Sequence, residues 1–137
     1  MVFDTLAYLF CYFVGNEVEE QTLHLAVSTD GYNFKALNNN ETVIKQTLGT
    51  GCVRDPHILR CEDGKTFYMV VTDMRSSLGW SSNRGMVLLK STDLINWTHS
   101  TVHFPTKYPK KWGNVIRVWA PETVYDKNTG KYMVFYS

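Results

Sequence analysis

Two short motifs in this chain carry side chains that could act on a substrate. The first is Arg54-Asp55-Pro56, and the second is Trp119-Ala120-Pro121-Glu122. A carboxylate can take a proton from water or deliver one to a leaving group, and an indole ring can stack on an apolar sugar face. Acids and tryptophans of this kind are suited to binding or acting on a sugar.

Each of these residues also has a structural interpretation. Asp before Pro commonly starts a turn, so Asp55 could be a turn residue. Arg54 could pair with Asp55 or with Glu122, and Glu122 could instead hold a loop donor. Trp119 and Trp80 could belong to an aromatic core. The motifs alone leave both interpretations open.

The elements around these motifs are predicted to be strands. Short runs rich in Tyr, Phe, Val, Leu and Met alternate with polar clusters of Gly, Asn and Asp, a pattern typical of β-structure. No window has the apolar spacing of an amphipathic helix, so almost no helix is expected. The predicted strands cover residues 6–14, 22–28, 34–37, 56–61, 67–72, 86–91, 97–102, 121–125 and 132–136.

An internal repeat indicates how the strands are grouped. Residues 25–34 recur as 88–97, with Ser-Thr-Asp at the centre of both copies, and residues 54–70 recur as 119–134. Two interleaved motifs at nearly one offset imply a four-stranded unit that is copied along the chain. Such a unit is a β-propeller blade, so we expect an all-β propeller.

The blades predict the domain organisation. Residues 1–137 form one partial propeller: 1–50 a blade that lacks its innermost strand, 51–104 a complete blade, and 117–137 the first two strands of a third. Propellers normally close with at least four blades, whereas this chain supplies about two and a half. We therefore expect an incomplete N-terminal portion whose open strand edges self-associate or bind a companion chain.

Strand direction then gathers the candidate residues on one rim. Consecutive strands of a blade run antiparallel, so the starts of inner strands and the loops between second and third strands share a side. That rim collects both motifs, the loop 15–21 and the loop 73–84, which adds Asp73 and Trp80 as candidate binding residues. The opposite rim receives the tight turns at 62–65 and 126–130.

Composition excludes several other classes of protein. Fourteen basic and 13 acidic side chains leave a charge of +1, so no footprint for nucleic acid is expected. The longest apolar run, 6–14, is too short for a membrane span and lacks the basic residues of an export signal. Three cysteines lack metal-ligand spacing, although Cys52 and Cys61 could pair. No metal or cofactor is predicted.

The two motifs resemble glycoside hydrolase family 43. So does the repeated pattern Ser-Thr-Asp-x-x-Asn, which is followed by Phe34 in the first copy and by Trp97 in the second. The stretch 8–26 also looks like a bacterial polysaccharide-degrading branch of that family. The resemblance implies a five-bladed propeller of the β-xylosidase, α-L-arabinofuranosidase or arabinanase type. It also implies a periplasmic, surface-bound or secreted location.

The resemblance further implies an inverting mechanism with three acids. Asp55 matches the general base, while the pKa-tuning aspartate and the general acid come later in the family's order than Ser137. The expected function is hydrolysis of pentose-containing plant polysaccharides or oligosaccharides, with Trp119, Glu122, Arg54, Asp73 and Trp80 binding substrate. The alternative is a non-catalytic carbohydrate-binding or scaffold propeller.

Overall fold

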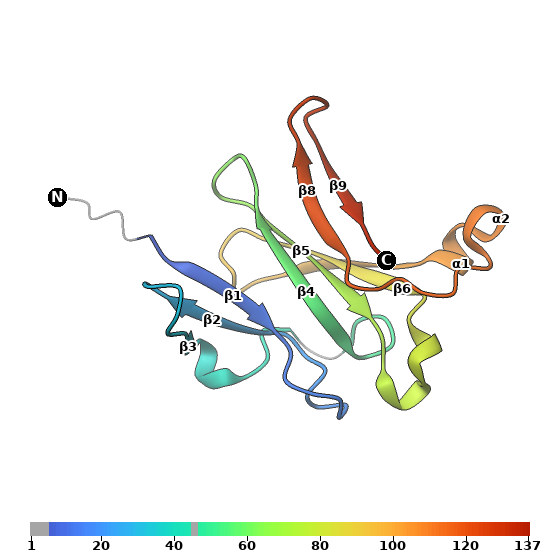
Figure 1. Cartoon of the computed structure of the whole chain (residues 1–137), viewed down its shortest axis with the longest axis horizontal. Helices are drawn as coiled ribbons and strands as arrows, with labels where there is room; N and C mark the ends of the chain where they lie inside the picture. Colours follow the sequence, from blue (N-terminus) through green and yellow to red (C-terminus); the bar gives the residue numbers. More distant parts are fainter. Residues whose placement is uncertain (1–5, 45–46) are drawn as a thin grey trace.

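The computed structural model describes residues 6–44 and 47–137, which form three antiparallel sheets in chain order (Figure 1). Each strand pairs only with its neighbours in sequence, so each sheet is a simple meander. The first sheet contains β1 (Tyr8–Tyr12), β2 (His24–Ser28) and β3 (Lys35–Ala36). The second contains β4 (Val53–Arg60), β5 (Phe67–Asp73), β6 (Gly85–Ser91) and β7 (Thr98–His103). The third contains β8 (Glu122–Asp126) and β9 (Lys131–Phe135).

All nine predicted strands are present, and the all-β class is confirmed. Their ends differ from the expected ones by a few residues. The largest difference is at β4, which begins at Val53 rather than at Pro56 because the ladder with β5 continues on both sides of the Asp-Pro pair.

Helix is confined to short turns. The connector between β7 and β8 contains α1 (Phe104–Lys107) and α2 (Pro109–Trp112), and three 3₁₀ turns span Asn38–Asn40, Ser76–Leu78 and Trp80–Ser82. Both α-helices have a proline in their first turn, where the missing N–H is not needed. None of the helices in residues 6–44 and 47–137 is long and apolar enough to cross a bilayer.

The core lies where the first two sheets face each other. Its buried members include Leu23 just before β2, Met69 and Val71 from β5, and Val87 and Leu89 from β6. A second, smaller cluster joins Met86 and Val102 to Val118 in the connector. Alternate strand residues supply these contacts, as the period of two requires. Sheet packing therefore holds the rim loops in place.

The repeated Ser-Thr-Asp segments form hydrogen-bonded turns. Ser28 Oγ accepts the N–H groups of Asp30 and Gly31, and Asp30 Oδ1 accepts those of Tyr32 and Asn33. Ser91 and Asp93 repeat this network in the second sheet. Hydrogen bonds from Asn33 hold the pKa of Asp30 far below its ordinary value, and those from Asn96 do the same for Asp93.

The two rims differ as expected. Figure 1 shows the β1–β2 loop and the loop after β5 on the lower side of the view, and the β4–β5 and β8–β9 turns on the upper side. Cys11, Cys52 and Cys61 are all free thiols, so Cys52 and Cys61 do not form the disulfide left open above.

Candidate functional site

Asp55 is presented by a bulge in β4. Arg54 pairs with Thr72 and His57 with Val70, so Asp55 and Pro56 together oppose a single residue of β5. Such a bulge re-aims the side chains at its apex. Asp55 has a left-handed φ of 46°, a conformation that costs a non-glycine residue on the order of 1 kcal/mol. Packing of β4 against β5 and its neighbours must therefore hold it there.

One hydroxyl fixes the Asp55 carboxylate. Thr72 Oγ1 donates to Asp55 Oδ2 at 2.9 Å and accepts the backbone N–H of Ala120 at 3.0 Å. A hydroxyl has one hydrogen, so accepting from Ala120 leaves that hydrogen free for Asp55. Within the described part of the chain, Oδ1 of Asp55 has no hydrogen-bond partner. The half-buried carboxylate is thus held by one oxygen and open at the other.

Arg54 lies beside Asp55, but its partners are neutral. Its guanidinium donates to Asn16 Oδ1 at 2.8 Å and to Gln21 Oε1 at 3.5 Å. The same group lies 4.6 Å from the ring centre of Phe13 and 5.4 Å from that of Trp80. Arg54 is 8% exposed, and its Nε has no partner among the described residues. It is therefore a buried cation enclosed by amides and aromatic faces.

A buried glutamine joins the two loops that enclose Arg54. Gln21 Nε2 donates to Asn16 O and to Ser76 Oγ, both at 2.9 Å, and Gln21 Oε1 accepts the N–H of Ser76 at 3.0 Å. Ser76 Oγ in turn donates to Asn16 O at 2.6 Å. These contacts tie the β1–β2 loop to the loop after β5.

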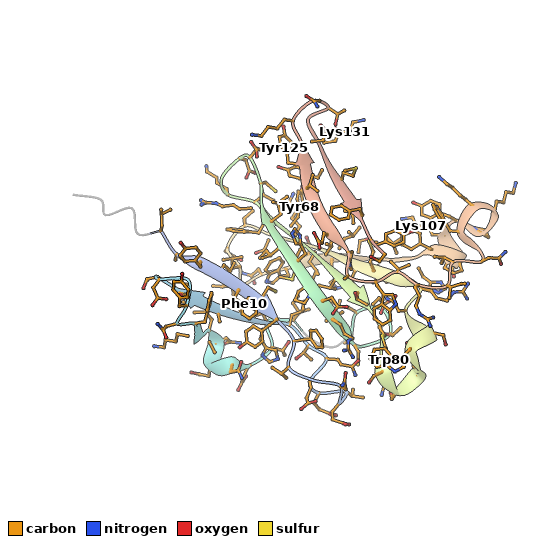
Figure 2. The ribbon with its side chains drawn as sticks, viewed as in Figure 1. Phe10, Tyr68, Trp80, Lys107, Tyr125 and Lys131 are labelled. Carbon is orange, nitrogen blue, oxygen red and sulfur yellow. The ribbon has the colours of Figure 1, made fainter. Side chains whose placement is uncertain are left out.

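Two tryptophans border the same rim. The ring centres of Trp80 and Trp119 are 5.9 Å apart, and Trp80 is 55% exposed. Trp119 exchanges both of its backbone hydrogen bonds with Ser137, at 2.8 and 3.0 Å, which fixes its position next to the third sheet. Figure 2 shows Trp80 on the loop after β5. The pair forms an aromatic corner beside the Arg54 cluster.

The two remaining candidate acids lie in different surroundings. Glu122 is the first residue of β8 and is exposed, and it forms no ion pair with Arg54. Asp73 is 4% exposed, and its Oδ1 accepts the N–H of Thr50 at 2.7 Å. A side chain at Gly49 would overlap the Asp73 carboxylate. Asp73 thus holds the loop that precedes β4.

The site also contains residues that the sequence did not identify. Thr72, Gln21 and Asn83 are each fully buried, and each bonds across sheets or loops. For Thr72, the sequence signal that could have identified it is a polar residue near the end of the otherwise apolar strand β5. His57 accepts the N–H of Thr123 at 3.2 Å and so links β4 to β8.

Among residues 6–44 and 47–137, no three His, Cys, Asp or Glu side chains come together as metal ligands do.

Comparison with known proteins identifies the family. A family model described as a probable glycosyl hydrolase domain, related to glycoside hydrolase family 43, matches residues 4–137. The chain belongs to this family. A curated relative, an alpha-L-arabinofuranosidase from Bifidobacterium longum subsp. longum, is 34% identical over 114 residues, which cover 79% of this chain and 11% of the relative.

Solved structures share the fold. A glycosyl hydrolase from Bacteroides ovatus aligns with a TM-score of 0.67 at 20% identity over 99% of this chain and 41% of its own. A GH32 beta-fructofuranosidase mutant from Bombyx mori, in complex with sucrose, aligns with a TM-score of 0.61 at 21% identity over 95% of this chain and 26% of its own. The chain therefore spans less than half the length of each of these proteins.

Proposed function

We propose that the full-length protein carrying this chain is an inverting glycoside hydrolase that acts on pentose-containing plant polysaccharides or oligosaccharides. The observation that carries the proposal is the Asp55 carboxylate, held at Oδ2 by Thr72 and unpartnered at Oδ1 among the described residues. The name of the arabinofuranosidase relative supports a pentose substrate.

In the proposed reaction Asp55 is the general base. Its free oxygen takes a proton from water, and the water oxygen attacks the anomeric carbon from the face opposite the leaving group. The bond between the anomeric carbon and the leaving oxygen breaks, and a general acid protonates that oxygen. Inverting enzymes place the two carboxyl groups roughly 6.5–9.5 Å apart. By the family's order of motifs, the general acid comes from a part of the protein outside this chain.

The neighbouring residues fit substrate binding. Trp80 and Trp119 offer aromatic faces to a sugar ring, and the Arg54 guanidinium lies 5.4 Å from the ring centre of Trp80. Glu122 is exposed near the start of β8 and is available to accept a sugar hydroxyl. Asp73 contributes by holding the loop before β4.

The test is Asp55→Asn in the full-length protein. Asn keeps an oxygen that can accept from Thr72, so the fold and substrate affinity should persist while turnover falls by about 10²–10⁴-fold. The matched control is Glu62→Gln, an exposed carboxylate on the opposite rim, which should leave turnover unchanged. NMR of the first-formed product should show the inverted anomer.

Unchanged turnover in Asp55→Asn would overturn the assignment of the base. Oligosaccharide binding without any hydrolysis by the wild-type protein would instead favour the carbohydrate-binding propeller.

A further inference from the structure

The connector between β7 and β8 is a concentrated source of positive charge. From residue 104 to residue 121 it contains no Asp or Glu, while the whole chain carries only +1. The rest of the chain is therefore net negative. The connector's cations are Lys107, Lys110, Lys111 and Arg117.

The side chains of these cations make few contacts that stabilise the fold. Lys107 Nζ lies 5.9 Å from the ring centre of Tyr108, and Lys111 Nζ lies 5.2 Å from that of Trp112. Within residues 6–44 and 47–137, none of the four cations forms an ion pair. Tyr108 is 45% exposed and Trp112 is 37% exposed, so the segment offers cations and aromatic faces together.

Hydrogen bonds with Asn83 and Arg84, just before β6, hold the second half of the connector. Arg84 donates to Val115 O at 2.9 Å and to Gly113 O at 2.7 Å. The fully buried Asn83 accepts the N–H of Val118 at 2.7 Å. These bonds hold the segment from Gly113 to Val118, which directly follows α2, and a fixed surface loses less conformational entropy when a ligand binds.

The connector also leads along the chain to the proposed sugar site. It begins at the outer strand β7 and ends at Trp119, whose ring lies beside Trp80. Figure 2 shows Lys107 at the far right of the view and Trp80 at the lower right. Three acidic side chains of this rim, Glu17, Glu19 and Glu20, belong to the β1–β2 loop, and Asp55, Asp73 and Glu122 lie on the same rim.

We propose that the connector binds a uronate unit of the polysaccharide whose neutral sugar lies at Trp119. This inference rests on the proposed function and names a substrate class for it. The uronate ring stacks on Trp112 or Tyr108, and its carboxylate accepts hydrogen bonds from Lys110 and Lys111. A dense polyanion such as nucleic acid fits less well, because the acidic β1–β2 loop on the same rim repels an extended phosphate backbone.

The test uses the full-length protein and pairs of oligosaccharides. Uronate-bearing oligosaccharides from arabinoxylan and pectin are compared with the same molecules after chemical reduction of the carboxylate to an alcohol. At low salt the acidic member should bind about fivefold more tightly than the reduced member, as expected from two exposed ion pairs. This affinity ratio should shrink at 0.5 M salt, because the Debye length falls from about 10 Å at 0.1 M toward about 3 Å at 1 M.

Charge-matched variants locate the effect. Lys110→Gln with Lys111→Gln should bring the affinity ratio close to one. Lys65→Gln with Lys127→Gln removes the same charge from the turns of the opposite rim and should leave the ratio unchanged. All four lysines are exposed, so the fold should persist in both variants, which circular dichroism verifies.

The remaining outcomes overturn the inference in distinguishable ways. Equal affinity for the acidic and reduced members overturns the uronate site but leaves the proposed function intact if the reduced member still binds. If the affinity ratio falls equally in the two double variants, the effect is one of general charge, which also overturns the inference. The same holds if single-stranded DNA binds as tightly as the acidic oligosaccharide. If no oligosaccharide binds or is hydrolysed, the proposed function fails as well.

Discussion

Thr72 Oγ1 lies 2.9 Å from Asp55 Oδ2, and the same hydroxyl accepts the N–H of Ala120 at 3.0 Å. Thr72 is in β5, Asp55 in β4, and Ala120 just before β8. One buried hydroxyl therefore couples the orientation of the proposed base to the position of the third sheet. The contact makes the geometry of Asp55 depend on residues distant in sequence.

Replacing Thr72 by Val should weaken both functions of this hydroxyl. Ala120 N–H loses its acceptor, so we expect a loss of about 1–3 kcal/mol in the free energy of unfolding, measured by urea denaturation. Turnover of the full-length protein should fall about tenfold or more, because Asp55 loses its only orienting hydrogen bond among the described residues.

Thr123→Val is the matched control. Thr123 is also buried, at 6% exposed, but its Oγ1 has no partner within the described residues. Removing that hydroxyl should leave stability unchanged or raise it. Equal effects of the two substitutions would contradict the role given to Thr72.

Replacing Arg54 by Met should destabilise the rim. The substitution leaves Asn16 Oδ1 without its donor and removes the planar group between Phe13 and Trp80. We expect a loss of about 2–4 kcal/mol in unfolding free energy and a shift in tryptophan fluorescence. Arg54→Lys should recover only part of this, since Lys lacks the planar fork.

Arg60→Met provides the comparison for Arg54. Arg60 is exposed at the end of β4; among the described residues its guanidinium donates only to Gly64 O across a turn and lies 5.9 Å from the ring centre of Phe67. Its loss should change stability by no more than about 0.5 kcal/mol. A similar cost for both arginines would argue against the enclosed arrangement of Arg54.

Acid should destabilise the fold through the turn aspartates. Hydrogen bonds lower the pKa of Asp30 and Asp93 far below the ordinary 3.8, and bonds from Thr66 lower that of Asp63 to about 2. A depressed native pKa stabilises the fold above the unfolded pKa, and this stabilisation is lost as pH falls through the native pKa. The urea midpoint should begin to fall below about pH 4.

Asp30→Asn with Asp93→Asn removes two of these titrating groups. The double variant should be less stable at pH 7 and should lose less stability between pH 4 and pH 2 than the wild type does. Parallel pH profiles for the two proteins would contradict the role of the turns.

Open strand edges should make the isolated 137-residue chain self-associate. Among the described residues, β1 and β9 each pair on one side only. Phe10 in β1 is 50% exposed, and Met133 and Phe135 in β9 are 54% and 45% exposed. Light scattering should report oligomers, and Phe135→Lys should reduce their size, because a charge on an edge strand opposes pairing. A stable monomer with sharp cooperative unfolding would contradict the prediction.

The strands were predictable because their signal is local. Alternating apolar residues and turn-forming clusters mark each of the nine strands, and Ser28 and Asp30 recur as Ser91 and Asp93 with the same hydrogen bonds. The one-turn helices were too short to produce a period.

The site was less predictable because its contacts are long-range. The motif proposed Asp55 as a site residue, but the hydrogen bonds of Thr72 to Asp55 and Ala120 depend on how β5 meets the segment before β8. One alternative for Arg54 was a pairing with Asp55 or Glu122, but its described partners are amides and rings from two loops. Such partners are set by packing between sheets, which no local pattern encodes.

Ala120 has nearly the same backbone angle φ as Asp55. Its φ is 44°, against 46° for Asp55, and a proline follows each residue in the repeated motif. One position carries a carboxylate and the other a methyl group, so the conformation does not depend on the acid. The repeat thus supplies two similar backbone positions, and the side chain at each decides whether it carries an acid. Ala120→Asp would therefore place a second carboxylate at the equivalent position of the third sheet.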